Sequence, residues 1–167
     1  MDWVFWLSLP RRFNFLERTL RLNTLGLGAF IILLISAPLL VQSDYRWLQY
    51  TGTLIYFMAD PLCHQLPGRC LFIGQLPMPV CARCLAIYSG ALTLCIFALL
   101  KRPVQAWPLK VYGVLLGLVI LEITCEKVLS LPGSTIMRMV SGFISGIIIA
   151  RLILESVFIL RISTTHG

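Results

Sequence analysis

Four cysteines and a histidine lie within one short stretch of this 167-residue chain. A Cys63-His64 pair is followed, across one loop, by a Cys81-x-x-Cys84 motif. The Cys-x-x-Cys spacing brings two sulfur atoms close enough to share one metal ion or to form one disulfide. Tetrahedral zinc takes four nitrogen or sulfur ligands, and three cysteines with one histidine are a standard set. The pattern therefore indicates a zinc site formed by Cys63, His64, Cys81 and Cys84.

Two other chemistries use the same side chains. Cys81 and Cys84 lie at the expected start of a helix with Arg83 between them, where the helix dipole and a nearby cation lower a thiol pKa. Such a dithiol, with Cys63 as its exchange partner, would perform thiol–disulfide exchange. A structural disulfide from Cys63 or Cys70 to Cys81 or Cys84 is the third interpretation. Cys70 could also replace one member of the metal-ligand set.

Charged residues inside apolar segments are the second feature with chemical potential. Glu122 and Glu126 are four residues apart and share one helix face, and Arg138 lies about one turn into the next helix. An ionisable side chain in a membrane span costs roughly 2.5–3.5 kcal/mol. We expect these three candidate catalytic residues to line a polar pocket beneath the cysteines; a structural Glu–Arg pair is the alternative. Three further charged residues are expected to act as snorkelling anchors at the other end: Arg151, Glu155 and Arg161.

The composition indicates that a lipid bilayer surrounds these residues. The chain is 58% hydrophobic and only 13% charged, with a mean hydropathy of +0.87. Soluble domains carry about 25% charged residues, and a chain this small cannot hide so much apolar surface inside itself. The net charge of +7 is spread over the ends of apolar segments, without a basic patch interleaved with aromatic residues. We therefore expect an integral cell-membrane protein that does not bind nucleic acid.

Apolar runs predict the spans. Residues 24–41 have about the length that crosses a bilayer, and further spans are expected over 82–100, 109–130 and 135–160. The aromatic-rich segment 45–62 either crosses the membrane or lies in its interface. If it does not cross, nearly all Lys and Arg residues face the cytoplasm, as the positive-inside rule requires. We therefore predict an all-α transmembrane bundle of four spans plus one re-entrant or interfacial helix, with five spans as the alternative.

This topology divides the chain into three parts. Residues 1–23 form a cytoplasmic or interfacial N-terminal segment, residues 24–161 a single transmembrane domain, and residues 162–167 a C-terminal tail. Both termini are expected in the cytoplasm, so the Cys/His loop at 63–84 faces outward.

Small residues give two of the expected helices smooth faces. Gly142-x-x-x-Gly146 and Gly113-x-x-x-Gly117 are spacings that let membrane helices approach closely. Packing within the chain is the expected use of both pairs. An oligomer formed through Gly142 and Gly146 is the alternative.

Two groups of residues resemble a known family of membrane proteins. The first runs from Cys63-His64-Gln65 to Pro79-Val80-Cys81-Ala82-Arg83-Cys84, and the second comprises Ser134, Arg138, Gly142 and Gly146. Both are similar to signatures of the family catalogued as domain of unknown function 2085. The resemblance implies a multi-helix membrane protein with a Cys/His site, and it implies no particular reaction. Cys70 stands where the family tends to have serine, which implies that it is not an essential ligand.

The sequence thus favours an integral membrane protein with an outer-face zinc site above an intramembrane Glu/Arg pocket. One alternative is a thiol–disulfide oxidoreductase that uses Cys81 and Cys84 and exchanges electrons with a lipid-soluble small molecule. The other is a non-catalytic assembly or transport subunit with a structural disulfide. No nucleotide-binding glycine loop or haem-attachment motif is present, and neither a substrate nor an enzymatic activity follows from the sequence.

Overall fold

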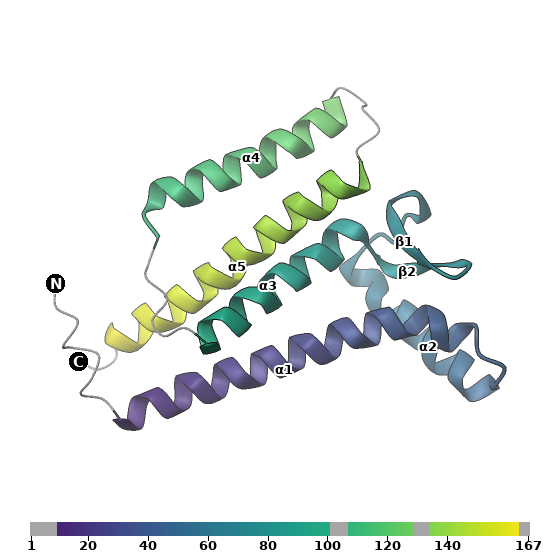
Figure 1. Ribbon diagram of the computed structural model, residues 1–167, viewed down its shortest axis with the longest axis horizontal. Coiled ribbons are helices and arrows are strands. Elements are labelled where there is room, and N and C mark those ends of the chain that lie inside the picture. The colour runs from purple at the N-terminus through teal and green to yellow at the C-terminus, as the bar shows by residue number, and fades with distance from the viewer. Residues whose placement is uncertain (1–9, 101–106, 129–133, 164–167) are drawn as a thin grey trace.

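The structure, a computed structural model, describes residues 10–100, 107–128 and 134–163 (Figure 1). Most of the expected C-terminal tail, the first nine residues of the expected N-terminal segment, and Lys101 and Arg102 lie outside these ranges. Two short 3-10 turns, Asp60–Leu62 and Pro67–Arg69, precede the only described hairpin. The described elements are α1 (Pro10–Val41), α2 (Arg46–Ala59), β1 (Cys70–Ile73), β2 (Leu76–Cys81), α3 (Ala82–Leu100), α4 (Leu109–Val128) and α5 (Thr135–Ser163).

The long helices alternate in direction. Helices α1 and α4 run one way and α3 and α5 the other, so the start of α1 and the end of α5 lie at the same end of the bundle (Figure 1). We call this the far end, and we call the end with α2, β1 and β2 the hairpin end. Three helices are long and apolar enough to cross a membrane: Glu17–Val41 of α1, Ala82–Leu100, and Thr135–Ser156 of α5. The predicted helical architecture is therefore confirmed, with three helices suited to cross a membrane.

Helix α4 has the length of a span but carries more charged residues along that length than the three candidate spans. Its 20 residues extend over about 30 Å, and they include Lys110, Glu122 and Glu126. Helix α2, with 14 residues, is only about 21 Å long and is shorter than the hydrocarbon core of about 30 Å. It folds back onto the end of α1, where Gly52 packs against Val41 and Ala37.

Helix α1 begins well before the predicted span at residue 24. Pro10 is its first residue, where the fixed φ of proline suits a helix and its missing N–H is not needed. Arginine and leucine, which form helices readily, then continue the helix into the apolar run. The described part of the expected N-terminal segment is therefore continuous with the first span.

A β-hairpin that the all-α prediction does not include fills the loop between the two cysteine motifs. Strands β1 and β2 pair antiparallel, with Ile73 opposite Leu76 across a two-residue turn. Gly74 takes a φ of +64° in this turn, a conformation that glycine adopts without strain. Proline is tolerated at Pro77 and Pro79 because a two-stranded sheet has only edge strands.

Helices α3 and α5 pack with their backbones almost in contact, because glycines line the interface. A Cβ atom added to Gly146 would lie 2.0 Å from the carbonyl oxygen of Ile87, and one added to Gly90 would lie 2.2 Å from that of Phe143. Gly142 is similarly tight, at 2.4 Å from the Arg83 oxygen. Such distances leave no room for any larger residue.

The two glycine pairs therefore differ. Gly142 and Gly146 face α3 within the chain, so an oligomer contact through them would have to displace α3; the oligomeric state stays a prediction. A Cβ atom added to Gly113 or Gly117 on α4 would have no neighbour within 4 Å outside its own helix. The expectation that this second pair packs against a neighbour within the chain is wrong.

These two helices supply a matched pair of substitutions. We expect Gly146→Ala to lower the free energy of unfolding by about 1–3 kcal/mol, because the added methyl group overpacks the α3–α5 contact. Gly117→Ala should change it by less than about 1 kcal/mol, in the stabilising direction, because alanine is the better helix former. Unfolding in detergent, followed by tryptophan fluorescence, measures both; equal destabilisation would contradict the packing described here.

Candidate metal centre

Three cysteine sulfur atoms converge at the hairpin end. Cys63 follows the 3-10 turn after α2, Cys81 is the last residue of β2, and Cys84 lies in the first turn of α3. Their Sγ atoms all lie within 4.8 Å of one another, and each residue is half-buried. We refer to Cys63, Cys81 and Cys84 as the cysteine cluster. Two segments separated by the hairpin are thus brought together, and the sulfur atoms are close enough to hold one metal ion.

Tertiary contacts hold the hairpin and the loop in place around the cluster. The Gln42 side chain at the end of α1 donates a hydrogen bond to the carbonyl oxygen of Ile73 at 3.0 Å. The Tyr56 hydroxyl of α2 donates one to the carbonyl oxygen of Pro77, and the Gln65 side chain donates one to the Tyr56 carbonyl at 2.8 Å. The proline-rich segment that carries the cysteines is therefore tied to both α1 and α2.

Backbone amides at the start of α3 point toward the cluster. The amide of Cys81 donates a hydrogen bond to the Cys63 sulfur at 3.2 Å. The Cys81 sulfur accepts hydrogen bonds from the Cys84 thiol, from the Cys84 and Arg83 amides and from Cys63, and these lower the pKa of Cys81 to about 5 despite its burial. The helix terminus therefore stabilises the thiolate that a metal ion or a disulfide exchange requires.

Cys70 lies beside the cluster but outside the group of three. It pairs with Cys81 across the hairpin, and it is buried. Burial, followed by the nearby sulfur atoms of Cys63 and Cys81, raises the pKa of Cys70 to about 11. A thiol that resists ionisation to this extent is a poor metal ligand and a poor nucleophile.

His64, the fourth expected ligand, does not join the cluster. Its side chain is exposed, and the group of ligand atoms within mutual reach contains the three cysteines alone among the described residues. Cys63 has extended backbone angles, φ −155° and ψ 136°. Side chains of consecutive residues in extended backbone point to opposite sides. The backbone that turns Cys63 inward therefore turns His64 outward.

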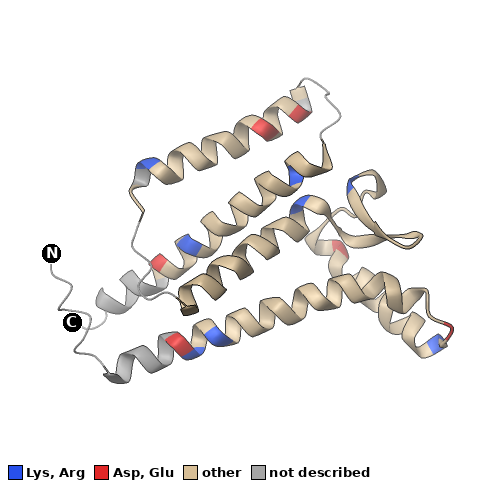
Figure 2. Cartoon of the chain, in the orientation of Figure 1, with Lys and Arg blue, Asp and Glu red and all other residues tan. Residues whose placement is uncertain are grey.

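Charged side chains form a network next to the cluster. The Arg83 Nη2 atom donates hydrogen bonds to both carboxylate oxygens of Glu122, at 2.9 and 3.0 Å, and to Glu126 at 2.8 Å. Arg138 donates to the other Glu126 oxygen at 2.7 and 3.1 Å. Arg69 lies 4.0 Å from the same oxygen. Figure 2 shows that the acidic residues of α4 and the first basic residues of α3 and α5 lie at the hairpin end.

The network contains the three candidate catalytic residues and two arginines that the sequence interpretation did not include. Glu122, Glu126 and Arg138 do lie at the same end as the cysteine cluster. Both carboxylates are engaged by Arg83, which the sequence interpretation treated only as a cation near the thiols. A signal for this role existed, because Arg83 lies in the first turn of an apolar helix that offers it no partner of its own.

A second polar group ties α4 to α5 at the far end. The Arg151 Nε atom donates hydrogen bonds to the Tyr112 hydroxyl at 3.1 Å and to Glu155 at 3.2 Å, and Tyr112 donates to Glu155 at 2.7 Å. The Arg151 guanidinium also stacks on Trp107, 4.3 Å from the ring centroid. Arg151 is only 4% exposed. The prediction that Arg151 is a snorkelling anchor is therefore wrong, because its guanidinium binds partners inside the bundle instead of reaching toward the membrane surface. The side chain of Arg161 lies outside the described ones.

The thiols of Cys81 and Cys70 should differ in reactivity. At about pH 6.5, Cys81 is mostly thiolate because its pKa is lowered to about 5, whereas Cys70, with a pKa raised to about 11, stays protonated. We expect brief treatment of the metal-free protein with iodoacetamide to modify Cys81 well before Cys70, as measured by peptide mass spectrometry. Equal rates, or a faster reaction at Cys70, would contradict the described hydrogen bonding.

Comparison with known proteins identifies the family of this chain. One curated relative, "Uncharacterized protein MJ1492" of Methanocaldococcus jannaschii, is 36% identical over 55 residues, which cover 32% of this chain and 35% of the relative. The match thus spans about a third of that protein's length. No solved structure matches the chain. Residues 63–152, which contain the cysteine cluster, α3, α4 and most of α5, match the family described as predicted membrane protein (DUF2085), and the chain belongs to that family.

Proposed function

We propose that this protein is a multi-pass membrane protein that binds one thiophilic metal ion, zinc, through Cys63, Cys81 and Cys84. The observation that carries the proposal is the convergence of three sulfur atoms within 4.8 Å of one another. Tetrahedral zinc with bonds of about 2.3 Å to sulfur places its sulfur ligands about 3.8 Å apart. A disulfide uses two sulfur atoms, whereas zinc sites in proteins use three or four protein ligands. The arrangement therefore favours metal binding over a single structural disulfide.

The surroundings of the cysteine cluster suit thiolate ligands. Thiolates bound to a metal keep part of their negative charge, and the amide hydrogen bonds to the Cys63 and Cys81 sulfur atoms offset it. With His64 turned outward, the protein supplies three ligands, which is the number that catalytic zinc sites use. The remaining position would accept water or a substrate group that approaches from the exposed side of the loop.

A positioning role for the Glu–Arg network accompanies this proposal. Glu122 and Glu126 both accept hydrogen bonds from Arg83, and Glu126 also accepts them from Arg138. Carboxylate oxygens that already accept hydrogen bonds from guanidinium groups have little capacity left to bind a substrate. We therefore assign these residues to the placement of α3, α4 and α5 around the site rather than to direct contact with a substrate.

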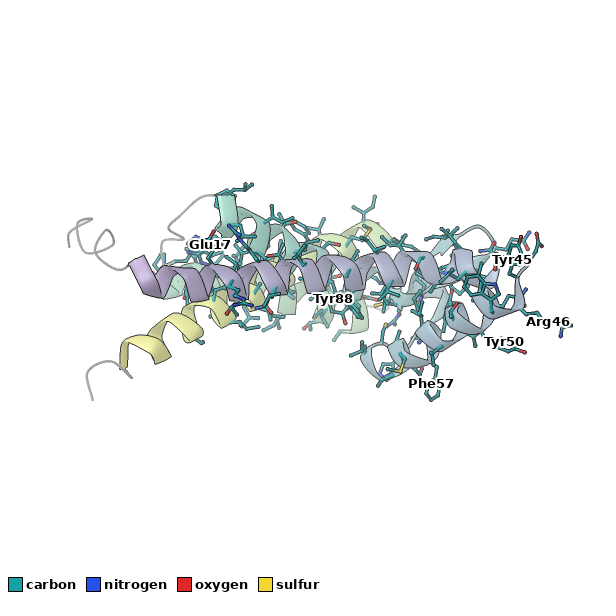
Figure 3. All side chains as sticks on the ribbon, turned by 90° about the horizontal axis from the view of Figure 1, so that it is seen from below. Glu17, Tyr45, Arg46, Tyr50, Phe57 and Tyr88 are labelled. Atoms are coloured by element: carbon teal, nitrogen blue, oxygen red, sulfur yellow. The ribbon has the colours of Figure 1, made fainter. Side chains whose placement is uncertain are left out.

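The alternation of helices supports four spans, with α4 as the fourth. The start of α1 and the end of α5 share the far end (Figure 1), which also carries Lys110, so the positive-inside rule places this end in the cytoplasm. Helix α2 would then lie in the outer interface. Tyr45, Tyr50 and Phe57 point away from the bundle there (Figure 3), as aromatic residues at headgroup depth do.

A thiol–disulfide oxidoreductase is the second candidate, and one observation favours it. Cys81 is a stabilised thiolate at a helix terminus and accepts a hydrogen bond from the Cys84 thiol, which is the arrangement of many dithiol active sites. Reversible formation of a Cys81–Cys84 disulfide, seen as a loss of two reactive thiols that dithiothreitol restores, would support this candidate. Protection of all three cluster thiols until zinc is removed would support the metal centre.

Metal analysis of the purified protein tests the proposal. We expect about one zinc ion per chain, and we expect Cys84→Ala to retain less than about a tenth of it, because a site with two sulfur ligands binds weakly. Cys95→Ala is the matched control, since it removes a thiol from the same helix away from the cluster and should retain the metal. A native protein without bound metal, or equal metal content in both variants, would contradict the proposal.

A further inference from the structure

Arg83 lies between the cysteine cluster and the charged network that contains Glu122 and Glu126. It lies between Cys81 and Cys84 in the sequence, both of which belong to the cysteine cluster, and its own side chain reaches α4. There its guanidinium binds Glu122 and Glu126 at 2.8 to 3.0 Å. We propose that Arg83 is a positioning residue that couples metal occupancy of the cysteine cluster to the docking of α4. This inference rests on the proposed metal site.

The first turn of α3 is held firmly enough to transmit such an effect. A Cβ atom on Gly142 would lie 2.4 Å from the Arg83 carbonyl oxygen and 3.1 Å from the Ala86 Cβ atom. Packing this tight gives the turn little freedom to slide along α5. A change at the cluster therefore reaches α4 through the Arg83 side chain rather than through a movement of the whole helix.

Helix α4 is, by contrast, held by a narrow stripe of side chains. Tyr112 and Val119 are each 8% exposed, whereas Val114, Leu118 and Leu121 are all more than half exposed. Buried apolar contact thus contributes little toward holding the helix at its hairpin end. The ion pairs of Glu122 and Glu126 are correspondingly important there, since charge pairs gain strength away from water.

The two glutamates depend on Arg83 to different degrees. Glu126 is also held by Arg138 and approached by Arg69. Glu122 has Arg83 as its partner among the described hydrogen bonds and ion pairs. Loss of the Arg83 guanidinium would therefore leave Glu126 bound to α5 and would release Glu122. This difference makes Glu122 the specific partner through which the coupling can be tested.

Two tethers on one turn reinforce each other. A metal ion ties the first turn of α3 to Cys63, and Arg83 ties the same turn to α4. Each tether removes conformational freedom that the other would otherwise have to remove, so each strengthens the other. By linkage, the factor by which the α4 contact raises metal affinity equals the factor by which the metal favours the α4 contact.

Zinc affinity in the purified full-length protein gives the first test, measured by competition with a chromophoric chelator in detergent. We expect Arg83→Gln to weaken zinc binding about tenfold, within the usual range of coupling between sites. Glu122→Gln should weaken it similarly, and the double variant should be no weaker than Arg83→Gln alone. Arg83→Lys, which keeps the charge, should recover part of the affinity.

The direction of the Glu122→Gln effect separates coupling from simple electrostatics. A zinc ion bound by three thiolates carries a net negative charge, so removal of a nearby carboxylate would by itself strengthen zinc binding, whereas loss of a positioning contact weakens it. Arg151→Gln is the matched control for Arg83→Gln, because it removes the other arginine that helps to hold α4, at the far end. We expect its zinc affinity to stay within about twofold of the wild type. Unchanged or tighter binding in Arg83→Gln or Glu122→Gln would overturn the inference.

The wild-type protein provides a second test that needs no variant to fold. Cys125 on α4 is half-buried and adjacent to Glu126, so its alkylation by N-ethylmaleimide reports how often this part of α4 opens. We expect zinc to slow alkylation of Cys125 several-fold in the wild type and not in Arg83→Gln. Equal rates with and without bound zinc would overturn the coupling alone, whereas a wild type that binds no zinc would overturn the proposed function as well.

Discussion

Close backbone contact between α3 and α5 is the constraint on which the rest of the hairpin end depends. Gly90, Gly142 and Gly146 allow the two helices to approach until backbone meets backbone. Among these contacts, the one between Gly142 and the Arg83 carbonyl determines where the first turn of α3 lies. Cys84 and Arg83 leave that turn in different directions, one toward the hairpin and one toward α4. The sulfur atoms and the charged network are therefore positioned by the same contact.

Ion pairs and hydrogen bonds within the bundle offset the free-energy cost of placing charged side chains in an apolar environment. At the hairpin end, Arg83 and Arg138 bind Glu122 and Glu126, while at the far end Arg151 binds Glu155 and Tyr112. Arg138 and Arg151 are thirteen positions apart on α5, which corresponds to about 20 Å along the helix. At this spacing the two groups fit toward opposite faces of a bilayer rather than together at its centre, where charges cost most. Helix α4 is attached at both ends by polar contacts and only sparsely in between.

Much of this architecture is readable from the sequence because it depends on local patterns. Long uncharged runs identify the membrane helices, and the spacing of Glu122 and Glu126 places them on one helix face. Chain connectivity brings Cys63 near Cys81 and Cys84, since one loop joins them. The expected glycine contact at Gly142 and Gly146 follows from the same kind of reasoning, because small residues at this spacing fit another helix closely.

The features that the sequence interpretation missed depend on details that only tertiary structure supplies. The outward direction of His64 follows from the extended backbone at Cys63, and the hairpin follows from one glycine in the left-handed region. The partnership of Arg83 with Glu122 requires the relative rotation of α3 and α4. A surface arginine and a buried one look alike in sequence, so the sequence alone does not predict the burial of Arg151. That burial depends on Trp107 and Tyr112, which are distant along the chain.

The central claim is that Cys63, Cys81 and Cys84 together bind one metal ion. X-ray absorption spectroscopy at the zinc edge of the purified protein tests this claim most directly, because it reports the atoms bonded to the metal. We expect three sulfur neighbours at about 2.3 Å and one lighter neighbour at about 2.0–2.1 Å. A first shell of nitrogen and oxygen atoms alone, or with a single sulfur atom, would contradict it.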